Sequence, residues 1–118
     1  MFEQDYIMRQ IKELVRALLK LLFHLDTDSP ALELLEQSTE REQKETVLDL
    51  VDAGRINEAE NLVYDADLET ALLFYSYVNE KSDEFLEANE FSRKEVLQGL
   101  KDCISRYGLD GITEIFLE

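Results

Sequence analysis

The chain has 118 residues, of which 45% are hydrophobic, and this is enough for one domain with a buried core. Twenty-seven acidic residues against 12 basic ones give a formal net charge of −15, which repels the phosphate backbone of nucleic acids. With only four glycines and one proline, long helices are favoured over many turn-linked strands. We therefore expect a single helical domain over residues 1–118 and no nucleic-acid partner.

The first predicted helix runs from about Glu3 to His24, where apolar residues recur at helical spacing in two adjacent seams. The first seam comprises Ile7, Ile11, Leu14, Leu18, Leu21 and Leu25, and the second comprises Met8, Val15, Leu19 and Leu22. Together they cover an arc of roughly 160°, which is wider than the stripe of about 100° that a surface helix needs. We expect Ile7, Ile11, Leu14 and Leu18 to face the core and the second seam to contact another copy in a homodimer. The alternative is a monomer in which the predicted helix from Asp67 to Ala88 and the C-terminal helix fill both seams.

Four basic residues follow the opposite side of this helix, within an arc of about 80°. They are Arg9, Lys12, Arg16 and Lys20, and they form what we call the basic stripe. Three interpretations stay open: plain solvation, pairing with acidic helices of the same or another copy, and docking on an anionic membrane surface.

The next elements are predicted from caps and polar breaks. Asp26 to Ser29 closes the first helix, and Ser29 with Pro30 is a typical cap and first-turn pair for a second helix. The polar stretch 37–44 predicts a break, after which Thr39 and Glu42 form a capping box for a new start.

A helical hairpin is predicted around Gly54, which can take the left-handed conformation that ends the preceding helix at Ala53. Asn57 with Glu60 is expected to begin the following helix. Small and apolar residues here have the spacing of a tetratricopeptide-like repeat: Leu50, Gly54, Ala59, Val63 and Ala66. A solenoid needs about three repeats, and no second copy follows, so we expect one isolated hairpin.

The second half predicts three more helices. A long central helix is expected from about Asp67 to Ala88, and Ser92 with Glu95 marks the start of another that ends at Tyr107-Gly108. A last short helix, about 110–117, offers Ile112, Ile115 and Phe116 to cover the core. The predicted fold is therefore all-α, a compact bundle of five to six helices that contains the tetratricopeptide-like hairpin.

Residues with catalytic or metal-binding chemistry are few. His24 is the only histidine and lies at a helix end, while Cys103 is the only cysteine and has the register of a core residue. The acidic cluster Asp83, Glu84, Glu87 and Glu90 lacks the histidines of a di-metal bundle site and is predicted to be a solvated face. We expect no catalytic residue, no cofactor and no metal site.

The sequence also predicts where the protein is found. A single cysteine fits a reducing compartment, and the acidic first residues do not resemble the basic start of a signal peptide. Charged side chains interrupt the longest apolar region, residues 11–25, so we expect no transmembrane segment and a cytoplasmic location.

Three parts of the chain together resemble a family of small uncharacterised proteins from gut Firmicutes, described only as a domain of unknown function. They are MFEQDYIMR at 1–9 with LLF at 21–23, LDLVDAGRINEAEN at 48–61, and FYSY at 74–77 with RYG at 106–108. The resemblance spans almost the whole chain and implies a bacterial cytoplasmic protein. It implies no activity, cofactor or catalytic residue.

These features predict a non-enzymatic helical protein–protein interaction module with an unknown protein partner. Two alternatives are a peripheral membrane protein that uses the basic stripe, and an acidic mimic of nucleic acid directed at a basic partner.

Overall fold

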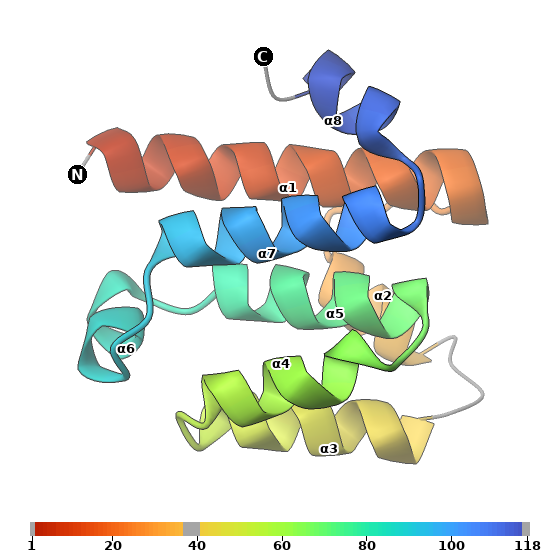
Figure 1. Cartoon of the computed structure of the whole chain (residues 1–118). Helices are drawn as coiled ribbons and strands as arrows, with labels where there is room; N and C mark the ends of the chain where they lie inside the picture. The colour runs from red at the N-terminus through yellow and green to blue at the C-terminus, as the bar shows by residue number, and fades with distance from the viewer. Residues whose placement is uncertain (1, 37–40, 117–118) are drawn as a thin grey trace.

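The computed structural model describes residues 2–36 and 41–116, and over these residues the chain is helical without any strand (Figure 1). The helices are α1 (Phe2–Phe23), α2 (Pro30–Glu36), α3 (Arg41–Asp52), α4 (Ile56–Tyr64), α5 (Leu68–Asn79), α6 (Asp83–Ala88), α7 (Arg93–Arg106) and α8 (Asp110–Phe116). The described part thus holds eight helices, more than the five to six predicted. The all-α fold class is confirmed, and the match of the α3–α4 hairpin to a tetratricopeptide repeat stays a prediction.

Most residues of the two apolar seams of α1 point into the molecule, whereas Leu21 and Leu22 are 57% and 40% exposed. Ile11, Leu14 and Leu18 of the first seam are completely buried, and so are Val15 and Leu19 of the second. Because α1 contacts α2, α5, α7 and α8, neighbours within the chain fill most of the wide apolar arc. This corrects the predicted assignment of Val15 and Leu19 to an exposed contact seam.

The start of α2 and the end of α3 lie where the sequence predicts them. Pro30 is the first residue of α2, as predicted. Gly54 has a φ of 81°, and the Arg55 backbone N–H donates to the Leu50 carbonyl oxygen at 2.9 Å, which ends α3 as expected. Thr39 of the predicted capping box lies outside the described residues.

The start of α4 differs from the prediction. The helix begins at Ile56, with Arg55 at the capping position, so Asn57 is already inside the helix. Ile56 is buried in the core, so the first residue of the helix already packs inside the molecule. Arg55 makes no side-chain cap and instead donates a hydrogen bond from Nε to Glu58 at 3.0 Å.

The helix α5 is the centre of the molecule, as predicted, and it contacts α1, α2, α3, α4 and α7 (Figure 1). It begins where Asp67 accepts a hydrogen bond from the Thr70 backbone N–H at 2.9 Å. The predicted continuation to Ala88 is wrong, because α5 ends at Asn79 and α6 begins at Asp83. The Ser82 side chain caps α6 by accepting from the Phe85 backbone N–H at 3.1 Å.

The helix α7 packs against α1 and α5, and α8 contacts α1 and α7. Ser92 caps α7 as predicted, accepting from the Glu95 backbone N–H at 3.2 Å, and Gly108, with a φ of 72°, lies just beyond its end. Cys103 is completely buried, in agreement with its predicted core register. In α8, Ile112 packs against the core, whereas Ile115 is 73% exposed and does not cover it. The Phe116 side chain and Leu117 lie outside what the structure describes.

Candidate functional site

A groove of about 370 Å³ runs over α5, with α4 on one side and α7 on the other. Figure 1 shows α5 between these two helices. We call this surface the α4–α7 groove. It is lined by Glu60, Asn61, Tyr64, Tyr75, Gly99, Asp102 and Arg106.

The groove depends on Gly99, which lies in the middle of α7. A Cβ atom at this position would lie 2.7 Å from Oε2 of Glu60 and 2.8 Å from Cε1 of Tyr75. Both distances are too short for a real side chain. The missing side chain therefore allows Tyr75 and Glu60 to approach the α7 backbone.

The floor of the groove is a hydrogen-bonded pair. The Tyr75 hydroxyl donates to Oε2 of Glu60 at 2.9 Å. Burial, together with the neighbouring Glu60 carboxylate, raises the pKa of Tyr75 far above its ordinary value. Tyr75 therefore stays protonated at neutral pH and serves as a fixed donor to Glu60.

One end of the groove carries an exposed cluster that we call the tyrosine–arginine cluster: Tyr64, Arg106 and Tyr107. The Arg106 guanidinium carbon lies 4.0 Å from the centre of the Tyr64 ring, and Nη1 donates to the Tyr64 carbonyl oxygen at 3.2 Å. The Tyr107 hydroxyl donates to the Ala66 carbonyl oxygen at 3.2 Å. These bonds fix the cluster, while Tyr64 and Tyr107 stay 63% and 45% exposed.

The two carboxylates of the groove lack a cationic partner in the described chain. Glu60 on α4 is half-buried and accepts the hydrogen bond from the Tyr75 hydroxyl. Asp102 on α7 accepts a hydrogen bond from the Gln98 amide at 2.9 Å. Neither carboxylate takes part in an ion pair among residues 2–36 and 41–116.

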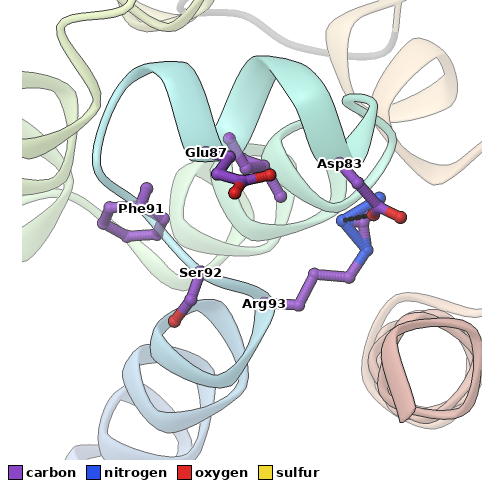
Figure 2. A pocket seen from close by; sticks show the side chains of 6 residues that line it. Asp83, Glu87, Phe91, Ser92 and Arg93 are labelled. Atoms are coloured by element: carbon purple, nitrogen blue, oxygen red, sulfur yellow. Dashed lines mark ion pairs between the residues drawn. The ribbon is translucent and has the colours of Figure 1, made fainter. Parts of the chain in front are cut away.

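A second hollow, of about 320 Å³, lies where α6 meets α7 and contains the buried Arg93 (Figure 2). Figure 2 shows the Arg93 side chain pointing toward Asp83, and its Nη1 lies 3.3 Å from Oδ1 of Asp83. Its Nη2 donates to the carbonyl oxygen of Lys81. Apart from the ion pair with Asp83, Nε and Nη1 make no hydrogen bond to the residues that the structure describes, and both atoms are buried. Arg93 therefore holds the α5–α6 corner against α7.

The structure separates the residues of the basic stripe. Arg16 pairs with Asp28 at 3.3 Å and with Asp26 at 3.7 Å, in the connection after α1. Lys12 and Glu80 both line a hollow of about 200 Å³. Burial raises the pKa of Glu80, and the positive charge of Lys12 only partly opposes this effect. Arg9 and Lys20 are exposed.

The remaining predicted contact residues also differ in their surroundings. Met8 is half-buried and lines the same hollow as Lys12, while Leu22 is 40% exposed. The predicted contact surface is therefore not one continuous face. A homodimer through other residues stays a prediction.

The residues with catalytic or metal-binding chemistry lie in different parts of the fold. His24 is exposed directly after α1, and the four acidic residues 83, 84, 87 and 90 are exposed, as expected for a solvated face. Within the described residues, no group of three or more histidine, cysteine, aspartate or glutamate side chains is placed to hold a metal ion. Among these residues, no helix has the length and apolar character needed to cross a membrane.

The sequence reasoning missed the α4–α7 groove. Its residues come from three helices, so no local spacing brings them together. The available signal was Gly99 inside a helical pattern, because a glycine there costs helix stability and indicates a close packing contact.

The comparison with protein families gives a match over residues 1–108 to the Family of unknown function (DUF6483). The match includes every residue of the groove, while α8 follows it. The comparisons with curated proteins and with solved structures gave no match. Because the family model covers nearly the whole chain, this protein belongs to the Family of unknown function (DUF6483).

Proposed function

We propose that the protein is a non-enzymatic protein–protein interaction module that binds its partner at the α4–α7 groove. The observation that carries this proposal is the exposure of Tyr64 and Tyr107 beside Arg106 at the end of the groove. Tyrosine and arginine are among the residues that contribute most to protein interfaces, especially next to a pocket. Hydrogen bonds hold the Arg106 and Tyr107 side chains, and the Arg106 guanidinium lies over the Tyr64 ring. Ordering these side chains on binding therefore costs little entropy.

The non-enzymatic part of the proposal rests on the surroundings of the reactive side chains. Burial raises the pKa of the Cys103 thiol, and Arg106 only partly opposes this effect. A buried thiol with a raised pKa is a poor nucleophile. His24, the usual kind of base for such a group, is exposed after α1.

The membrane alternative receives less support from the structure. A helix that binds a membrane surface inserts an apolar face and keeps a basic face in the headgroup region. Most of the apolar arc of α1 is buried in the core, which leaves the basic stripe without such a face. The nucleic-acid mimic rests on the acidic charge alone.

The proposal is tested by capture from an extract of cells that make the protein, with immobilised wild type and two variants. Tyr64→Ala removes an exposed ring from the groove, while Leu32→Ala removes a similarly exposed side chain from α2, outside the groove. We expect one protein to be retained by wild type and by Leu32→Ala, and at least about tenfold less of it by Tyr64→Ala. Circular dichroism confirms that both variants are folded.

Equal retention by all three proteins would show that the groove is not the contact surface. If quantitative mass spectrometry finds no protein enriched over a blank support, the interaction function itself is wrong.

A further inference from the structure

The charge of the α4–α7 groove indicates which kind of partner it accepts. The groove has one carboxylate from α4, Glu60, and one from α7, Asp102, and neither forms an ion pair within the described chain. A carboxylate has about four acceptor positions, so one bond from Tyr75 or Gln98 leaves room for further donors. A cationic donor from outside would therefore find two carboxylates in the groove.

The chain's own cation does not fill this role. The Arg106 guanidinium is held over the Tyr64 ring and bonded to the Tyr64 carbonyl oxygen, at one end of the groove. The raised pKa of Tyr75 keeps its hydroxyl neutral and bonded to Glu60. The formal charge of the lining is thus one positive against two negative side chains.

The size of the groove fits one long side chain. Its volume of about 370 Å³ is near the lower end of the range of about 300–1,000 Å³ for sites that enclose a small molecule. Glu60 and the buried Tyr75 ring lie against Gly99. The aliphatic part of a lysine or arginine would therefore lie along the exposed Asn61 and Tyr64 of α4.

The charge of the whole molecule acts in the same direction. A net charge of −15 attracts basic partners over a distance and accelerates their association at low salt. On the basis of the proposed function, we infer that the partner is a protein segment whose lysine or arginine side chain enters the α4–α7 groove between Glu60 and Asp102.

The test is a titration of the isotopically labelled protein, followed by the backbone amide signals in nuclear magnetic resonance spectra. The probes are N-acetyl-arginine amide and N-acetyl-lysine amide, with N-acetyl-glutamine amide as the neutral control. We expect saturable shifts at Gly99, Glu60 and Tyr64 with one or both cationic probes and none with the neutral one. The probe that saturates at the lower concentration identifies the preferred side chain.

Two variants make the result specific to the groove. The double variant Glu60→Gln with Asp102→Asn keeps an acceptor for Tyr75 and removes both charges, so cationic binding should weaken at least about tenfold. Glu84→Gln removes an exposed charge on α6, outside the groove, and should leave the affinity unchanged. Its unchanged affinity also excludes a mere effect of net charge.

The inference is overturned if the cationic probes cause no saturable shift at the groove, or if the double variant binds them as well as wild type. If these outcomes occur while Tyr64→Ala still reduces the capture of a partner, the proposed interaction function stands. Only the inference that a lysine or arginine enters the groove is then wrong.

Discussion

At the scale of single residues, Gly99 has no space for the smallest side chain. We predict that Gly99→Ala lowers the free energy of unfolding by about 1–3 kcal/mol, because the new Cβ displaces Glu60 and the Tyr75 ring. In an open helix the same substitution stabilises by about 1 kcal/mol. Urea denaturation at pH 7 measures the difference from wild type.

Gly111 in α8 is the matched control, because a Cβ there meets no atom within 4 Å and its backbone is not left-handed. Gly111→Ala should be as stable as wild type or slightly more stable. If Gly99→Ala and Gly111→Ala have the same stability, the close approach of α7 to α5 and α4 is not as described.

The same residue shows how far a sequence predicts a site. A glycine inside a helix indicates that something packs closely against it. What packs there, Glu60 from α4 and Tyr75 from α5, is set by the arrangement of helices and by no spacing near residue 99. The groove therefore becomes visible only when the three helices are in place.

At the scale of helices, the cap of α5 makes stability depend on pH. Burial alone would raise the pKa of Asp67, but hydrogen bonds from the Thr70 backbone and hydroxyl, together with the charge of Lys44, hold it below its ordinary value. A carboxyl whose pKa is lowered by folding stabilises the protein above its unfolded pKa, near 3.8, and this contribution is lost as the pH falls through the folded value.

We predict that Asp67→Ala lowers the free energy of unfolding by about 1 kcal/mol at neutral pH, the usual cost of losing a cap. The difference from wild type should shrink when the denaturation is repeated below the folded pKa, where wild-type Asp67 is protonated. Asp67→Asn keeps an acceptor without the charge. Its free energy of unfolding at pH 7 should lie between those of wild type and Asp67→Ala. A difference that stays constant with pH would show that the charge of Asp67 does not contribute.

Helix boundaries with local causes were predictable, and those with distant causes were not. Asp67, Ser92 and the left-handed Gly54 act within a few residues of themselves, so the sequence indicates these boundaries directly. The break between α5 and α6 has Ser82 as a local signal, but the corner is also held by Arg93 bonding to the Lys81 carbonyl oxygen from another helix. The prediction of one long helix could not include that contact.

At the scale of the whole molecule, the apolar arc of α1 is covered mainly by the chain itself. We predict that Leu19→Glu unfolds the protein, because it would bury an unpaired carboxylate at a completely buried position, at a cost of several kcal/mol. Leu22→Glu, in the same predicted seam but 40% exposed, should stay folded. Circular dichroism and thermal melting separate the two results, and a folded Leu19→Glu would restore the seam as a surface.

The wide apolar arc of α1 is compatible with two arrangements, a dimer contact and packing within one chain. It indicates that α1 has more than one apolar neighbour, but periodicity does not show whether the neighbours belong to the same chain. Here α5, α7 and α8 contact it, and each lies far from α1 in the sequence.

The central claim, that a protein partner binds at the α4–α7 groove, is tested most directly by photocrosslinking. The light-reactive residue p-benzoylphenylalanine replaces Tyr64 at the groove, or Leu32 on α2 as the control, and each protein is irradiated in an extract of its own cells. We predict one discrete crosslinked product at position 64, absent at position 32 and suppressed by excess unmodified protein. The same products at both positions, or none at position 64, would contradict the account.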